Sequence, residues 1–113
     1  MHELSLLESV REILEQQAVQ QNFVTVTSVT LEIGKLSSVE PEAIRFGFDI
    51  VMQNSLAEHA ELIIEHVPGL GLCLDCQQEV EISALYEPCP LCNNFSVKLT
   101  QGTEMKIKEL NVR

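Results

Sequence analysis

Four cysteines, arranged as two Cys-x-x-Cys pairs, constrain this chain more than any other feature of its sequence. The pairs are Cys73/Cys76 and Cys89/Cys92, and the chain has no other cysteine. In a reducing compartment such a cluster is typical of a metal site, because two tight turns that face each other can present four thiolates to one ion. A segment this short has almost no core of its own, so we expect metal binding to supply its folding free energy.

Zinc is the metal that this cluster favours. Tetrahedral four-sulfur sites suit zinc, and iron in a rubredoxin-like site is the main competitor. Rubredoxin-type carriers pack aromatic side chains around the iron, whereas this segment offers only Tyr86 and Phe95. A thioredoxin-like dithiol is a further alternative, which two motifs this close together disfavour. Four protein ligands leave no position for water, so we expect a structural site, with Asn93 in a left-handed conformation that lets backbone N–H groups reach the sulfurs.

Size and charge limit the partners of the protein. The chain has 113 residues, which predicts one compact unit with a small appendage. Its formal net charge of -10 predicts repulsion from phosphate backbones and anionic membranes, so we expect no nucleic acid and no membrane among its partners. No apolar stretch reaches the roughly 18 residues of a membrane span, and the start of the chain lacks the pattern of a signal peptide. We therefore expect a cytoplasmic protein.

Hydrophobic periodicity predicts two helices and three strands outside the cysteine segment. In the first strand Val29, Leu31 and Ile33 share one face, which predicts one buried side. Before the second helix, Pro41 suits a first helical turn. The expected ranges are 3–22 and 41–55 for the helices and 23–33, 61–67 and 105–112 for the strands.

These elements predict an α+β fold in which two helices pack on a small three-stranded sheet. A turn-rich stretch at 68–71 marks the point where the sequence changes character. We expect residues 1–68 plus 103–113 to form the α+β domain, and residues 69–102 to form an inserted zinc-ribbon-like domain with the four cysteines.

The first three residues form a second candidate metal site. The α-amine of Met1, the imidazole of His2 and the backbone amides between them can form fused small chelate rings around one ion. Square-planar nitrogen donation is what Ni(II) and Cu(II) prefer. The first N–H groups of a helix have no intrahelical acceptor, so metal can replace one proton without breaking a helical hydrogen bond. Glu3 adds a carboxylate where the helix dipole favours negative charge.

Several motifs together resemble the HypA/HybF family of nickel-insertion proteins for nickel–iron hydrogenases. The resemblance covers essentially the whole chain in order and spacing. The motifs are Met1-His-Glu-Leu-Ser5, Leu31-Glu-Ile-Gly-Lys-Leu-Ser37, the two cysteine pairs, and Thr100-Gln-Gly-Thr-Glu-Met105.

The resemblance implies a metallochaperone. It makes His2 the principal nickel ligand, assisted by the amine of Met1 and by the backbone or carboxylate of Glu3, and it places Glu40 where some members have a further acidic nickel ligand. The α+β domain then becomes the nickel-binding domain, and the four cysteines bind structural zinc. The implied partners are the nickel-delivery GTPase of the hydrogenase maturation system and the hydrogenase large subunit precursor. The sequence does not determine the oligomeric state, and a homodimer is one assembly that it leaves open.

Other residues offer weaker candidates. His59 lies in a polar loop and His66 alternates along a strand, so we expect both to be solvated or hydrogen-bonded. The sequence has no phosphate-cradling glycine loop and no Ser-His-Asp candidate, so we expect no enzyme. The alternative to a nickel chaperone is a zinc-ribbon protein–protein interaction module whose Met-His-Glu start is incidental.

Overall fold

The computed structural model describes the backbone of residues 2–113 and the side chains of residues 3–113. Within this range the chain forms two compact units. The first contains residues 2–31, 39–65 and 106–113, and the second contains Glu32–Ser38 and His66–Met105. In chain order the elements are α1 (His2–Gln21), β1 (Val26–Gly34), α2 (Pro41–Val51), β2 (Glu61–Val67), β3 (Gly69–Cys73), β4 (Glu79–Ile82), β5 (Val97–Gln101) and β6 (Met105–Val112).

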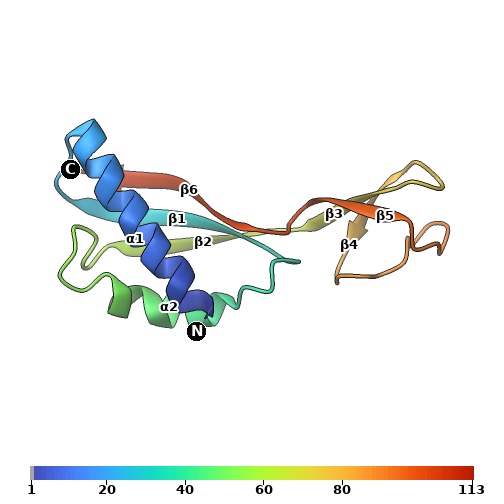
Figure 1. Ribbon diagram of the computed structural model, residues 1–113, viewed down its shortest axis with the longest axis horizontal. Helices are drawn as coiled ribbons and strands as arrows, with labels where there is room; N and C mark the ends of the chain where they lie inside the picture. Colours follow the sequence, from blue (N-terminus) through green and yellow to red (C-terminus); the bar gives the residue numbers. More distant parts are fainter. Residues whose placement is uncertain (1) are drawn as a thin grey trace. The chain divides into compact units, whose positions relative to one another are not determined.

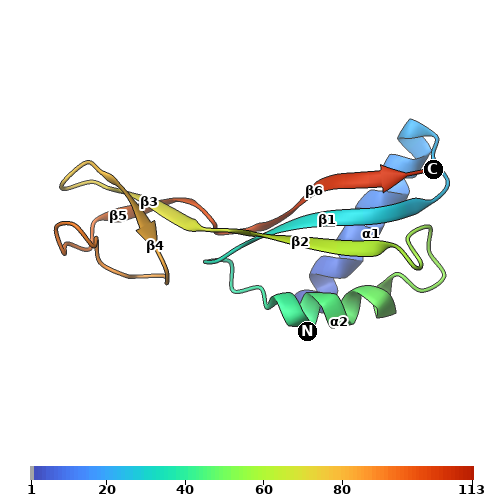
Figure 2. The same cartoon turned by 180° about the vertical axis from the view of Figure 1, so that it is seen from behind.

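The first unit confirms the predicted α+β class. Its sheet has three strands in the order β2-β1-β6. Helix α1 crosses one face of this sheet, in front of the strands in Figure 1 and behind them in Figure 2. The helix buries Leu7, Val10 and Leu14, which recur at helical spacing. It ends one residue before Asn22, whose φ of 58° lies in the left-handed region that ends helices.

Strand β1 is buried on both sides, not only on the predicted one. Ser28 and Thr30 are buried polar residues, on the faces between the apolar ones. β1 is the central strand, so polar side chains of its neighbours can cover it. Asn111 donates from Nδ2 to Ser28 Oγ at 2.6 Å, and Lys108 Nζ lies 2.7 Å from Glu65 Oε1, which joins β6 to β2 across β1.

Helix α2 begins as predicted and ends early. Glu40 is its N-cap, and its side-chain Oε1 accepts a hydrogen bond from the backbone N–H of Glu42 at 3.3 Å. Pro41 occupies the first turn, where its missing N–H costs nothing. The helix ends at Val51, short of the predicted end at residue 55, because Asn54 has a φ of 61° that an α-helix cannot accommodate.

The second unit contains a sheet that hydrophobic periodicity does not predict. Strand β3 lies at its centre and pairs antiparallel with β4 and with β5. Gly69 pairs with Ile82 at one end of β3, and Cys73 pairs with Val97 at the other. The strands are short and β3 is rich in glycine, so a period of two residues leaves little trace in the sequence.

Two glycines let two separate segments of the second unit meet. The backbone N–H of Gly34 donates to the carbonyl of Glu104 at 3.0 Å, and that of Leu36 donates to the carbonyl of Gly102 at 2.8 Å. A Cβ on Gly34 would overlap the backbone of Gly102, and Gly102 itself has a φ of 90°. The motifs at residues 31–37 and 100–105 therefore pack against each other. Neighbouring backbone lies so close to positions 34 and 102 that only glycine fits there.

Candidate metal centre

The four cysteine sulfurs lie together in the second unit. Their Sγ atoms are all within 4.8 Å of one another, and none of the four forms a disulfide. Two contacts join the two pairs, with 3.5 Å between the Sγ atoms of Cys73 and Cys92 and 3.8 Å between those of Cys76 and Cys89. Four sulfurs at about 2.3 Å from a tetrahedral zinc ion are separated by about 3.8 Å. The cluster therefore fits zinc in a zinc-ribbon-like segment.

The two cysteine turns have the same backbone hydrogen bonds. In the first, the N–H of Gln77 donates to the carbonyl of Cys73 at 2.8 Å, and in the second the N–H of Asn93 donates to the carbonyl of Cys89 at 2.8 Å. Each leading cysteine in turn donates to the carbonyl five residues on, at 3.0 Å for Cys73 and 2.8 Å for Cys89. Two copies of one turn thus present sulfurs to a common centre.

Left-handed residues shape both turns. Asn93 has a φ of 66°, which confirms the prediction made from its position after the second pair. Gln77 has a φ of 58° in the same place after the first pair, and sequence reasoning missed it. Its position could have indicated this conformation, because Gln77 directly follows Cys76 just as Asn93 directly follows Cys92.

The pKa values of three of the cysteine thiols are shifted in different directions. The backbone N–H of Cys76 donates to Cys73 Sγ at 3.5 Å and lowers the pKa of Cys73 to about 7. Burial, together with the hydrogen bond to Cys73, raises the pKa of Cys76 to about 12. For Cys92, the backbone N–H of Asn94 lowers the pKa, but the Cys73 sulfur and burial outweigh it, so the pKa is raised. Neighbouring sulfurs thus hinder the ionisation of Cys76 and Cys92, and a divalent cation that binds them favours their thiolate forms.

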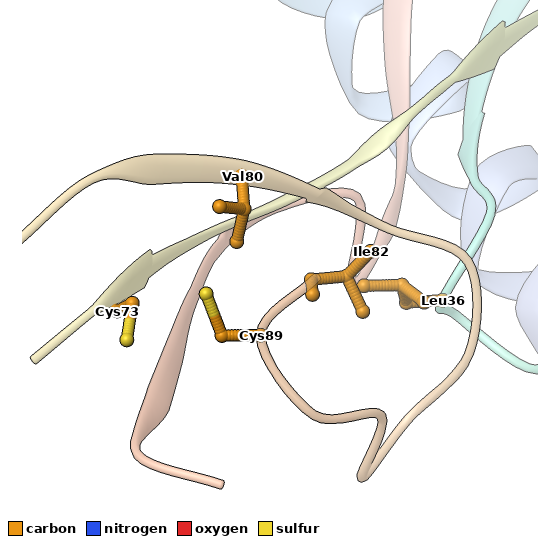
Figure 3. Close-up of a cluster of buried hydrophobic side chains, with 5 residues drawn as sticks. All are labelled: Leu36, Cys73, Val80, Ile82 and Cys89. Carbon is orange, nitrogen blue, oxygen red and sulfur yellow. The ribbon is translucent and has the colours of Figure 1, made fainter. Parts of the chain in front are cut away.

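Around the sulfurs there is little apolar core. Figure 3 shows a cluster of five buried side chains in the second unit, which come from β3, β4 and the segments that carry Leu36 and Cys89. Two of these five buried residues are themselves cysteines. So few apolar side chains do not offset the entropy of ordering the unit, which makes a structural metal the expected stabiliser. The buried residues are Leu36, Cys73, Val80, Ile82 and Cys89.

The amino-terminal candidates are only partly within the described structure. Met1 and the side chain of His2 lie outside the described residues. Glu3 is half-buried in the first turn of α1, and its Oε2 accepts a hydrogen bond from the backbone N–H of Glu40 at 3.4 Å. The structure thus brings Glu3 to the residue before α2, next to the other acidic candidate. It also gives Glu40 an N-capping role that sequence reasoning missed.

The remaining histidines are placed as expected. His59 and His66 are both exposed, as predicted for solvated side chains. Among the described residues, the four cysteines are the only group of three or more histidine, cysteine or acidic side chains whose ligand atoms are clustered closely enough to hold a metal ion. No helix in the described part of the chain has the length and apolar character needed to cross a membrane.

The fold and the four-thiol cluster define a small α+β protein with a zinc-ribbon-like metal-binding unit. A family model described as "Hydrogenase/urease nickel incorporation, metallochaperone, hypA" matches residues 1–112. The chain belongs to this HypA family, whose members are nickel metallochaperones and maturation factors rather than enzymes. The expected family is thereby confirmed.

Relatives match over nearly their full length. The hydrogenase maturation factor HypA of Psychromonas ingrahamii is 48% identical over 112 residues, which cover 99% of this chain and 98% of that protein. That of Rhodopseudomonas palustris is 48% identical and covers 99% of both chains. The solution structure of the Ni metallochaperone HypA from Helicobacter pylori has a TM-score of 0.73 at 27% identity, covering 97% of this chain and 96% of that one.

Proposed function

We propose that this protein binds Ni(II) at its amino terminus and delivers it to the large subunit precursor of a nickel–iron hydrogenase during maturation. The observation that carries the proposal is the family match, because it extends over residues 1–112 and so includes the Met-His-Glu start. The family description names both hydrogenase and urease nickel incorporation. We assign delivery to hydrogenase because the relatives at 48% identity are hydrogenase maturation factors.

The proposed nickel ligands are the amine of Met1, the imidazole of His2 and the backbone or carboxylate of Glu3. α1 begins at His2, so the first backbone N–H groups have no acceptor within the helix and are available to a metal. Nickel favours such nitrogen donors in a planar arrangement. The cargo would therefore be held by the end of the chain, where ligand exchange with a recipient needs little rearrangement of the fold.

Glu40 is the proposed accessory ligand. Its backbone N–H donates to the Glu3 carboxylate at 3.4 Å, so the two acidic residues are neighbours within the first unit. Its own carboxylate caps α2 through the N–H of Glu42 at 3.3 Å. A carboxylate that accepts one long hydrogen bond retains free lone pairs for a metal. Glu40 would then add an oxygen ligand only when nickel takes more ligands than the four of a square-planar site.

Zinc has a separate role in the proposal. Cys73, Cys76, Cys89 and Cys92 are its proposed ligands, and zinc would stabilise the inserted domain of residues 69–102. The α+β domain of residues 1–68 and 103–113 would carry the nickel. The division separates a permanent structural ion from a transferable one.

The proposed partners are the proteins that nickel delivery requires. Nickel transfer requires contact with other proteins, and we assign the nickel-delivery GTPase of the maturation system and the hydrogenase large subunit to this role, with a homodimer as a further assembly. We also propose a cytoplasmic location, where the precursor would receive its metal. The net charge of -10 argues against nucleic acid as a partner.

The test is a metal analysis of four proteins after equilibrium dialysis against Ni(II) and Zn(II). We expect wild type to bind stoichiometric nickel and one zinc, and His2→Ala to lose nickel but keep zinc. His66→Ala, which removes an exposed histidine elsewhere, is the matched control and should keep both. A variant extended by Gly-Ser before Met1 should also lose nickel, because its α-amine has moved. Undiminished nickel in both His2→Ala and the extended protein would instead favour the interaction-module alternative.

A further inference from the structure

A groove of about 530 Å³ runs between α1 and α2 in the first unit. It contains none of the proposed metal ligands. One wall belongs to α1 and the other to the last turn of α2. The groove is lined by Leu4, Glu8, Arg11, Glu12, Glu15, Ile50 and Val51.

The α2 wall is apolar and open to solvent. Ile50 is 50% exposed. Phe46 does not line the groove, but it lies one turn earlier on the same side of α2 and is 76% exposed, so it extends the apolar surface beyond the groove. Exposed apolar side chains that adjoin one another on a small protein are typical of contact surfaces, since single scattered ones carry no such meaning. An aromatic residue of this size is also the kind of side chain that dominates binding energy at interfaces.

The α1 wall is acidic. Glu8, Glu12 and Glu15 succeed one another along the helix, and all three are exposed. Glu15 Oε2 lies 3.4 Å from Arg11 Nε, whereas Glu8 and Glu12 have no cationic partner among the described side chains of residues 3–113. The rim therefore carries uncompensated negative charge beside an apolar wall.

The two walls are fixed relative to each other. Arg11 Nη1 donates to the carbonyls of Val51 at 2.8 Å and Gln53 at 3.2 Å, which ties the middle of α1 to the end of α2. Near the start of α1 the helices approach closely at Gly47, where a Cβ would lie 2.9 Å from Leu7 Cδ1. A preformed groove of this kind needs little ordering on binding, which lowers the entropic cost of association.

We infer that this groove docks an amphipathic, basic helical segment of a partner protein. Its apolar side chains, at helical spacing, would contact Phe46 and Ile50, and its lysines or arginines would lie along Glu8 and Glu12. Charge complementarity selects this occupant, because the acidic wall repels acidic segments and anionic lipid surfaces. The surface is independent of nickel, so it stands whether or not the terminus binds metal.

The experiment titrates the zinc-loaded protein with a synthetic peptide of about 18 residues, a length that supports helix formation, with leucines on one helical face and lysines on the other. Amide chemical-shift changes should concentrate on α1 and α2. Phe46→Ala and the double variant Glu8→Gln/Glu12→Gln should each weaken binding by about tenfold. Raising the salt concentration should weaken wild-type binding more than that of the double variant.

Matched controls separate docking from general attraction to an acidic protein. Phe95→Ala removes an aromatic ring of almost equal exposure, 75%, from the second unit. Glu79→Gln/Glu81→Gln removes two exposed carboxylates from β4. Both controls should bind the peptide within twofold of wild type. Equal weakening by the controls, or shift changes spread over both units, would overturn the inference. So would self-association in sedimentation that Phe46→Ala abolishes, because the occupant would then be a second copy of this chain.

Discussion

The backbone N–H of Leu36 donates a hydrogen bond to the carbonyl oxygen of Gly102 over 2.8 Å, and Leu36 belongs to the buried cluster that surrounds the cysteines. Leu36 lies in the short segment that follows β1, whereas the other members of that cluster come from the cysteine-bearing part of the chain. The stability of the metal-binding unit thus depends in part on a residue far from any cysteine in the sequence.

Gly102→Ala should destabilise the second unit. Gly102 has a φ of 90°, and a Cβ there would lie 2.8 Å from both Gly69 Cα and Pro68 O. We expect a loss of about 1–3 kcal/mol, typical of a strained backbone position. Urea denaturation of the zinc-loaded protein measures it. Thr103→Ala, at the exposed neighbouring position, is the control and should change stability by less than about 0.5 kcal/mol. Equal stability of the two variants would contradict this account of the glycine.

Cys89→Ser should remove zinc and unfold the second unit while the first stays folded. Four sulfurs are needed to complete the tetrahedral shell, and the unit has only a small core without them. Elemental analysis measures the zinc, and amide NMR spectra report each unit separately. Resonances of α1 and α2 should keep their dispersion. Collapse of the whole spectrum would show instead that the two units fold as one.

Acid should release zinc, with a steep dependence on pH. In the metal-free protein the pKa of Cys76 is raised to about 12, so this thiol holds its proton throughout the neutral range. Zinc must displace that proton, so the zinc dissociation constant should rise at least tenfold for each unit that the pH falls. Below about pH 7 the slope should steepen, because Cys73, with a pKa of about 7, also takes up a proton. Competition with a chromophoric chelator measures this, and a flat profile between pH 8 and pH 6 would refute it.

Glu40→Ala should separate the capping role of this residue from its proposed role as a ligand. Loss of the N-cap of α2 should lower stability by about 1 kcal/mol. Glu40→Asp keeps a good capping side chain and should restore most of that stability, but its shorter side chain moves the carboxylate away from a metal. Thermal unfolding and nickel calorimetry are the two readouts. Unchanged nickel affinity in both variants would remove Glu40 from the ligand set.

The isolated protein should hold nickel in a planar, nitrogen-rich site. Such a site is diamagnetic and gives a weak visible band at short wavelength, whereas an octahedral site with Glu3 or Glu40 oxygens is paramagnetic. Absorption and magnetic susceptibility of the nickel-loaded protein distinguish the two. Nickel affinity should fall as the pH drops through the range of the imidazole and the α-amine, because each donor must be deprotonated to bind.

Local patterns predicted the outline of the first unit well. The spacing of Leu7, Val10 and Leu14 predicted a helix with a buried face, and Asn22 correctly marked its end. The burial of Ser28 and Thr30 was not predictable, because alternation along a strand does not reveal that polar side chains of other strands cover it. Such burial depends on the order of strands in the sheet, which is a property of the whole fold.

For the metal centre, spacing predicted the residues but not how the chain holds them. The cysteine pairs alone indicate one ion between two turns, and the structure brings the four sulfurs together. The sheet that carries Cys73 escaped prediction because its strands are too short for a clear period. Gln77 escaped because glutamine is not a residue type associated with left-handed backbone. The ligand roles of His2 and Met1 remain predictions, for which the described residues supply only the position of Glu3.

Most of the second unit, residues 68–104, is inserted between β2 and β6, and the length of this insertion has little influence on the stability of the first unit. When zinc is absent, the inserted stretch acts as a flexible loop that joins two strand ends of one sheet. The entropy of closing such a loop grows only with the logarithm of its length, so doubling the insertion costs about 0.6 kcal/mol. Lengthening or shortening this stretch would therefore alter how the protein holds zinc while leaving the helices and their sheet nearly as stable as before.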